Sequence, residues 1–268
     1  MSSQTILITN DDGVNAAGLM ALKEELDRVA RVEVYAPDHN WSAAGRTRTF
    51  HKPLRVNRIR LLDGTVGHAT SGTPSDCISL ALLGLLKQPP QLIVSGINPG
   101  LNVGRDITYS GTVAAAMEGV REGIPAVAVS LDVGSEPSES PEYTLAAEFT
   151  ASLALFLLDE KPLPKGILLN VNVPRLPTGR VPEVRLTRLG GHAYSNYLVK
   201  GEDPRGRSYY WITGDPLTKI PPEEEGTDIW AIAKGFISIT PIHLDMTEYS
   251  LVDTLQEWGH RTWFNEEN

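Results

Sequence analysis

The chain has 268 residues, of which 41% are hydrophobic and 21% are charged, as in a globular protein with a large core. Its formal net charge of −9 argues against a basic surface that holds duplex nucleic acid. The single cysteine, Cys77, excludes an intramolecular disulfide framework and favours a reducing compartment, so we expect a cytoplasmic protein. The sequence shows neither a signal peptide nor an apolar run long enough to span a membrane.

The first expected strand ends in two adjacent carboxylates. Residues 6–8 are aliphatic, as in a buried strand, and Asn10, Asp11, Asp12 and Gly13 follow closely. Adjacent carboxylates repel each other and are costly to desolvate, and a bound cation removes that cost. Because successive strand residues point to opposite faces, both carboxylates converge only where the chain turns. The pair predicts either a metal site or a solvated acidic cap for the next helix.

A βαβ unit is expected around this turn. Apolar residues recur at helical spacing between 19 and 29, and residues 32–36 form a second strand that stops at Pro37. Ligands of such sheets bind beyond the carboxyl ends of the strands. The acidic turn and the loop at 37–45, which contains Ser42, are therefore expected at one edge.

The later elements predict a Rossmann-like α/β fold: a mostly parallel sheet flanked by helices, with a C-terminal hairpin and helix extension. We assign residues 1–188 to the core and 189–268 to the extension, which we expect to serve oligomerisation. In the first half of the chain we expect β-structure within 50–70, a helix capped by Thr73 with Pro74 and Asp76, and strands at 91–94 and 126–131. A linker at 134–141 should lead to a helix at 143–158 and a strand at 167–173. The last third should contain a hairpin that turns at 203–206, a strand at 235–242 and a helix at 247–258.

A glycine-rich stretch at residues 95–112 follows one of the core strands. It is neither a Walker A loop nor a dinucleotide fingerprint. It leads into an alanine-rich helix that begins at Ser110, Gly111 and Thr112. Free amide groups and the helix dipole favour an anion there, although simple capping by Ser110 or Thr112 explains the residues too.

These motifs together resemble the SurE family of survival-protein-type nucleotidases, which remove phosphate from nucleoside monophosphates with a divalent metal. The likeness covers nearly the whole chain and is most specific at residues 95–112. Trp41 departs from the basic residue that relatives often carry, and Arg46 and Arg48 are candidates to compensate for it. The other stretches that carry the resemblance are residues 10–13, Pro37 and Asp38 with Ser42, 72–76, 203–211 and 238–241.

The resemblance implies a metal held by Asp11, Asp12, Ser42 and Asn98. Carboxylate, hydroxyl and amide oxygens form a hard ligand set, which suits Mg²⁺ or Mn²⁺, one ion per subunit. It also implies a C-terminal extension exchanged between subunits, hence a homodimer or homotetramer.

The expected reaction is attack of water on a phosphate monoester, with the nucleoside monophosphate as substrate. Asn98, Ser110, Gly111 and Thr112 are expected to bind the phosphate, and Asp11 or Asp12 to accept a proton from the water. The sequence lacks the spaced Asp-x-Asp typical of enzymes that form an aspartyl-phosphate. It leaves the choice between 5′ and 3′ phosphates open.

Two other readings remain at this point. Receiver-type signalling domains also bind Mg²⁺ with paired acids, but they need a further acid and a lysine at later strand ends, and no lysine lies beside Ser95 or Leu131. A non-catalytic nucleotide-binding protein would also have the anion site, but it would not need the carboxylate pair Asp11 and Asp12.

Overall fold

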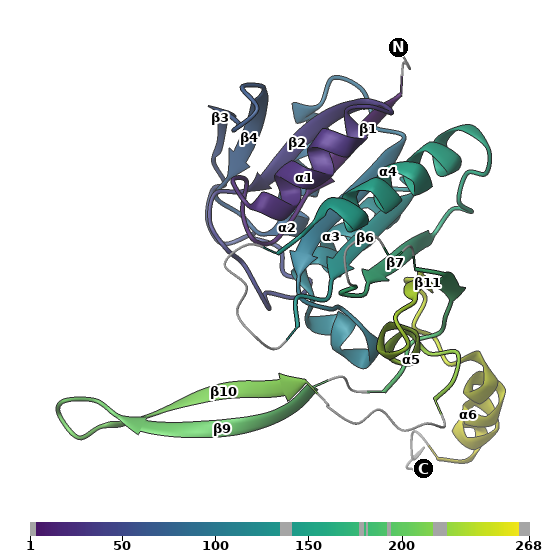
Figure 1. Cartoon of the computed structure of the whole chain (residues 1–268). Coiled ribbons are helices and arrows are strands. Elements are labelled where there is room, and N and C mark those ends of the chain that lie inside the picture. The colour runs from purple at the N-terminus through teal and green to yellow at the C-terminus, as the bar shows by residue number, and fades with distance from the viewer. Residues whose placement is uncertain are drawn as a thin grey trace.

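The computed structural model describes residues 4–134, 141–176, 180, 182–191, 194–216 and 224–262. Most of them form a mostly parallel sheet with helices on both faces (Figure 1). The predicted Rossmann-like α/β class is therefore confirmed. The predicted linker at 134–141 lies almost entirely outside the described residues.

The central sheet has nine strands in the order β3-β4-β2-β1-β5-β6-β7-β11-β8. Two neighbouring pairs, β3–β4 and β7–β11, are antiparallel, and the other pairs are parallel. The carboxyl ends of β1, β2, β5, β6 and β7 therefore meet at one edge, as the βαβ pattern predicts. The strands are β1 Thr5–Thr9, β2 Arg31–Pro37, β3 Val56–Arg60, β4 Val66–Thr70, β5 Leu92–Pro99, β6 Ala126–Leu131, β7 Ile167–Val173, β8 Val184–Leu186 and β11 Ile237–His243.

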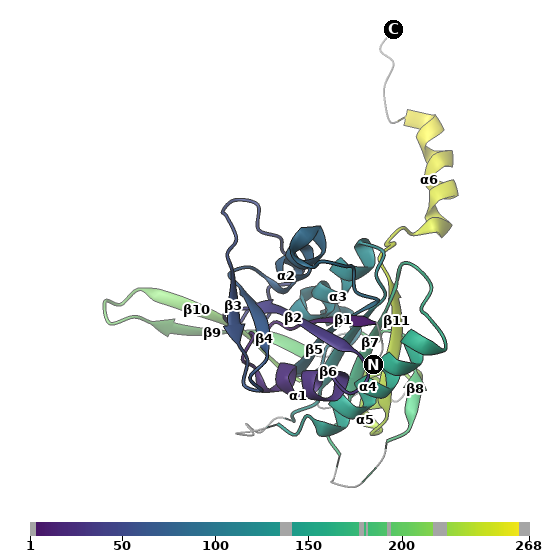
Figure 2. The ribbon, with the colours of Figure 1, turned by 90° about the horizontal axis from the view of Figure 1, so that it is seen from above.

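Two helix pairs cover the two faces of this sheet. Figure 2 shows α1 (Ala17–Leu26) and α4 (Thr144–Asp159) on one face, with α2 (Pro74–Leu80) and α3 (Gly111–Arg121) on the other. The alternation of strand side chains explains the two cores. Ile6 and Ile8 pack in the cluster under α1 and α4, whereas Leu7 packs in the cluster under α2 and α3. The helices of the described ranges are all too short or too polar to cross a membrane.

Several local predictions are confirmed in atomic detail. Thr73 caps α2 through a capping box with Asp76, and Pro74 is its first residue. Ser110 caps α3, because its Oγ accepts a hydrogen bond from the Val113 N–H at 3.1 Å. Cys77 is fully buried, which raises the pKa of its thiol to about 12 and keeps it unreactive.

The structure also differs from the expected elements. β5 extends to Pro99, well into the stretch expected to be loop, because Asn98 and Pro99 pair with β6 after a bulge. A π-helical turn, η1 (Ala81–Leu85), follows α2 and contains Gly84 at φ 139°. A 3₁₀ helix, η2 (Gly104–Tyr109), and the helix α5 (Asp228–Ala233) were not expected.

The C-terminal part of the chain is divided between the sheet and two projections. β11 is inserted in the central sheet between β7 and β8. The predicted hairpin is confirmed as β9 (Tyr194–Glu202) and β10 (Ser208–Pro216), and it extends away from the body (Figure 1). The helix α6 (Tyr249–Thr262) also projects from the body, as Figure 2 shows. The division of the chain at residue 188 stays a prediction. The strand β11 belongs to the proposed extension by sequence but lies within the core sheet.

Candidate metal and phosphate site

The turn after β1 brings the two adjacent carboxylates to the edge of the sheet. The Asn10 side chain closes this turn, because its Nδ2 donates to the Gly13 carbonyl at 3.0 Å and its Oδ1 accepts from the Gly13 N–H at 3.2 Å. Gly13 has a φ of 110°, which side-chain-bearing residues rarely adopt. The residues that precede and follow the pair therefore fix its geometry.

Asp11 is held against the start of α3. Its Oδ1 accepts a hydrogen bond of 2.7 Å from the Thr112 hydroxyl, and its side chain is nearly fully buried. A Cβ at Gly111 would lie 2.8 Å from Asp11 Oδ2, so only glycine allows this approach. Burial raises the pKa of Asp11, and the Thr112 bond partly opposes this rise.

Asp12 has fewer partners than Asp11. The Asn40 amide donates to its Oδ1 at 3.3 Å, whereas its Oδ2 is buried and has no hydrogen-bond partner among the described residues. Burial, with the charge of Asp11 as a second cause, raises the pKa of Asp12 to about 6. A carboxylate pair with an unpartnered buried oxygen fits a cation, which would satisfy that oxygen and remove the repulsion.

The loop after β2 lies against this turn. The Trp41 N–H donates to the Asp11 carbonyl at 2.7 Å, and the Ser42 N–H donates to Asn40 Oδ1 at 2.7 Å. Asn40 therefore links Ser42 to Asp12 through its own side chain. These bonds connect the backbone of the exposed Ser42 to the carboxylate pair, and its role as a metal ligand stays a prediction.

Asn98 reaches the same edge from the neighbouring strand. β1 and β5 are adjacent, with Thr9 opposite Ser95, and the bulge in β5 follows Ser95. The Asn98 Nδ2 donates to the Gly100 carbonyl at 2.7 Å, so the amide oxygen remains for a ligand.

The start of α3 offers backbone donors more than side chains. The Ser110 Oγ is occupied by capping, and the Thr112 hydroxyl is occupied by Asp11. The N–H groups of Gly111 and Thr112 lie in the first turn, where an α-helix supplies no acceptor. A phosphate would therefore be bound there by amide groups at the positive end of the helix dipole.

Polar side chains from later strands hold the glycine-rich stretch in place. The Asn102 N–H donates to Asn172 Oδ1 at 2.9 Å, and the Asn102 carbonyl accepts from Asn170 and Asn172 at 2.8 and 2.9 Å. Asp228, at the start of α5, accepts from the Gly104 and Gly190 N–H groups, both at 2.8 Å. Sequence reasoning missed Asp228, because no local pattern connects it to Gly104.

The loop that carries Ser42 has its own anchors further along. Asp76 accepts from both the N–H and the hydroxyl of Thr49, at 3.0 and 2.7 Å. Arg46 and Arg48 lie 4.0 and 3.7 Å from the buried carboxylate of Glu118 on α3. Both arginines therefore face Glu118, and their expected role in place of a basic residue at position 41 stays a prediction.

The fold and this site define a Rossmann-like α/β protein with a carboxylate pair at the carboxyl edge of its sheet. Residues 6–196 match the family model described as survival protein SurE. The chain is 46% identical over 260 residues to the 5'-nucleotidase SurE of Herpetosiphon aurantiacus, which covers 97% of this chain and 99% of the relative.

A second relative and a solved structure agree. The 5'-nucleotidase SurE of Moorella thermoacetica is 45% identical over 260 residues, which covers 96% of this chain and 97% of the relative. The crystal structure of the SurE protein from Aquifex aeolicus matches with a TM-score of 0.80 and 38% identity over 95% of this chain and 99% of that chain. The chain belongs to the survival protein SurE family, and the identification made from the sequence motifs is confirmed.

Proposed function

We propose that this chain is a divalent-metal-dependent nucleotidase that hydrolyses nucleoside monophosphates to nucleoside and phosphate. The observation that carries the proposal is the buried Asp12 Oδ2, which has no partner among the described residues and lies in a carboxylate pair. The names of the relatives, 5'-nucleotidase SurE, support the same reaction and favour 5′ phosphates.

We assign the metal to Asp11, Asp12, Ser42 and Asn98, which supply only oxygen ligands. This set suits one Mg²⁺ or Mn²⁺ ion per subunit. In the described part of the chain, no group of three or more His, Cys, Asp or Glu side chains could hold a metal, so neutral oxygens must complete the set. When bound, the ion would polarise a phosphoryl oxygen and lower the pKa of a water ligand.

The protein groups have separate tasks in this reaction. The N–H groups of Gly111 and Thr112, at the start of the helix capped by Ser110, bind the phosphate, and Asn98 orients it from β5. Asp12 is the better placed proton acceptor of the pair, because Asp11 Oδ1 already accepts the Thr112 hydroxyl bond. Water attacks phosphorus, its proton passes to the carboxylate, and the nucleoside oxygen leaves and is protonated.

We also propose that the chain assembles as a homodimer or homotetramer through residues 189–268. Large apolar side chains are exposed on both projections, with Trp211 64% exposed on β10 and Trp258 61% exposed on α6. Exposed apolar surface of this kind usually marks a protein interface. The free, buried Cys77 agrees with a cytoplasmic location.

The test is phosphate release by the full-length protein from a panel of nucleoside 5′- and 3′-monophosphates with Mg²⁺, Mn²⁺ or EDTA. We expect release that depends on metal and that falls more than about 100-fold in Asp12→Asn, since even outer partners of metal ligands cost 10–100-fold. Asp159→Asn, at the end of α4, is the matched control and should keep full activity.

The same experiment can overturn the proposal. Nucleotide binding without phosphate release under any metal would leave a non-catalytic nucleotide binder. Undiminished release in EDTA or in Asp12→Asn would reject the metal site assigned here.

A further inference from the structure

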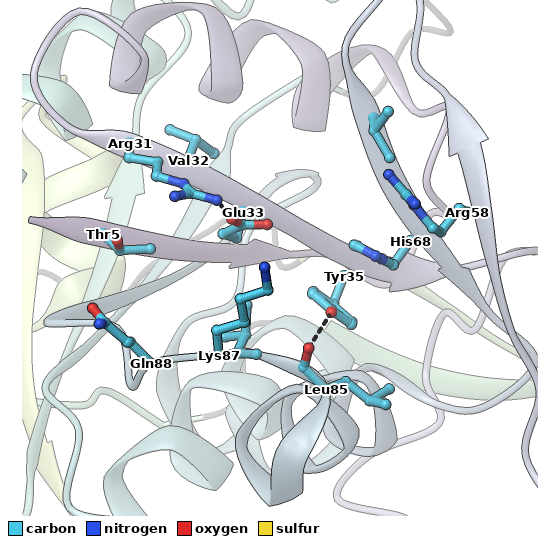
Figure 3. Close-up of a pocket in the computed structure, with 12 residues that line it drawn as sticks. Thr5, Arg31, Val32, Glu33, Tyr35, Arg58, His68, Leu85, Lys87 and Gln88 are labelled. Carbon is cyan, nitrogen blue, oxygen red and sulfur yellow. Dashed lines mark hydrogen bonds and ion pairs between the residues drawn. The ribbon is translucent and has the colours of Figure 1, made fainter.

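A separate groove of about 700 Å³ lies on the α2 side of the sheet. Figure 3 shows the residues that line it. It begins at Thr5 and Arg31, the first residues of β1 and β2, whereas Asp11 and Asp12 follow the opposite end of β1. Its walls are the faces of β2, β4 and β3 on one side and residues 85–88, which begin at the last residue of η1, on the other. The volume is in the usual range for a small-molecule site.

Three side chains form a row across the floor and far wall of the groove. Tyr35, His68 and Arg58 are directly opposite one another in the register of β2, β4 and β3. The rings of Tyr35 and His68 stack, with centroids 4.1 Å apart and an interplanar angle of 12°. The Tyr35 hydroxyl donates to the Leu85 carbonyl at 3.3 Å, which ties the floor to the opposite wall. A flat aromatic surface therefore lies beside a guanidinium group.

The charges of the lining are mainly positive. Arg31 is paired with Glu33, but in the described ranges the side chains of Arg58 and Lys87 have neither a hydrogen bond nor an ion pair. Figure 3 shows Lys87 rising from the segment below the strands, with Arg58 and His68 at the far side. These cations stand out because the whole chain has a formal net charge of −9. Unpaired cations in a concave site attract an anion.

We infer that this groove is a second, non-catalytic site for a phosphorylated nucleoside. Its base would stack on the outer face of His68, next to Arg58, and its phosphate would be bound between Arg58 and Lys87. Aromatic stacking accepts any base, whereas two cations without acidic partners favour a ligand that carries a phosphate. The inference does not depend on the proposed hydrolysis, because the groove uses none of the residues assigned to the metal or to phosphate transfer.

The test is protection of Lys87 from acetylation in the full-length protein, measured by peptide mass spectrometry in EDTA. EDTA removes the metal, so adenosine monophosphate (AMP) stays intact whether or not the protein is a nucleotidase. As AMP rises to about nine times its dissociation constant, mass action leaves about a tenth of the groove free, and acetylation of Lys87 should slow about tenfold. Lys165, outside this groove, is the internal control and should react at an unchanged rate.

Variants and ligand fragments make the result decisive. Arg58→Gln should remove most of the protection, whereas Arg60→Gln, on the same strand but not in the lining, should keep it. Adenosine and inorganic phosphate should each protect Lys87 less than AMP. Unchanged Lys87 reactivity, equal protection of Lys165, or full protection in Arg58→Gln would overturn the site. Equal protection by inorganic phosphate would overturn the nucleoside as its ligand. Separately measured phosphate release reports on the proposed function alone.

Discussion

Two buried acidic regions border the glycine-rich stretch between β5 and α3, and they differ in how their oxygens are satisfied. At α5, Asp228 accepts N–H bonds from Gly104, Gly190 and Ile229 at 2.8, 2.8 and 2.9 Å. At β1, Asp12 has one bond of 3.3 Å, and its buried Oδ2 has no partner among the described residues.

The difference separates a structural carboxylate from one that needs a ligand. Burial raises the pKa of Asp228, but its backbone donors oppose that rise and use up its acceptor capacity. Asp12 has no comparable donors, and Asp11 adds a like charge beside it. Buried acids alone therefore do not identify a site, whereas an unsatisfied pair does.

Replacing Asp228 should have the larger effect on stability. Asp228→Asn keeps the shape of the side chain but places an NH₂ group opposite a backbone N–H. The free energy of unfolding should fall by about 2–4 kcal/mol, the cost of leaving buried N–H groups unpaired. Urea unfolding of the metal-free protein measures this, with the surface variant Asp159→Asn expected to stay within about 0.5 kcal/mol of wild type.

Asp12→Asn should behave oppositely in the same metal-free measurement at neutral pH. It removes a partly buried charge that Asp11 repels, so the free energy of unfolding should be unchanged or higher. If both substitutions destabilised the protein equally, Asp12 would have hidden structural partners and the distinction between the two regions would fail.

The sequence predicted the elements whose signals are local. The aliphatic run and acidic turn at 6–13 and the capping box at Thr73 depend on residues close in sequence, and both are confirmed. Of the two caps considered for α3, the structure shows Ser110. Strand ends in a parallel sheet meet at one edge, so the site could be placed there without coordinates.

The contacts between distant residues could not be predicted. Thr112 and Asp11 are 101 residues apart, and Gly104 and Asp228 are 124 residues apart. No periodicity encodes either bond, because each depends on how separate elements dock. For the same reason the sequence suggests Thr112 as a phosphate ligand but does not reveal that its hydroxyl is bonded to Asp11, which leaves only its N–H for the phosphate.

The Thr112 hydroxyl satisfies one oxygen of Asp11, as backbone N–H groups satisfy Asp228. Removal of this hydroxyl should weaken the metal site. Thr112→Val keeps the volume but loses the donor to Asp11 Oδ1, so the affinity for Mn²⁺ should fall about 10–100-fold. Thr112→Ser keeps the hydroxyl and should recover most of that affinity. Titration calorimetry measures the affinity for Mn²⁺. At saturating metal the KM for the nucleoside monophosphate should be unchanged, because both variants keep the Thr112 N–H. Equal losses in both variants would mean that packing, not the hydroxyl, is what matters.

The smallest expected effect is the pH dependence of the carboxylate pair in EDTA. The pKa of Asp12 in the fold is about 6, above its ordinary value of 3.8. A group with a raised pKa contributes stability that is fully present below the ordinary pKa and is lost as pH rises through the raised pKa.

The Tm of wild type relative to that of Asp12→Asn should therefore fall between about pH 4 and pH 6, the window set by these two pKa values. The subtraction removes the carboxylates that lie away from the pair, so the difference reports the titration of Asp11 and Asp12 together. Added Mg²⁺ or Mn²⁺ should reverse the fall, because the cation replaces the proton and binds more strongly as pH rises. A Tm difference that does not change with pH would show that the metal-free fold already compensates the charge of Asp12, and that Asp12 needs no cation.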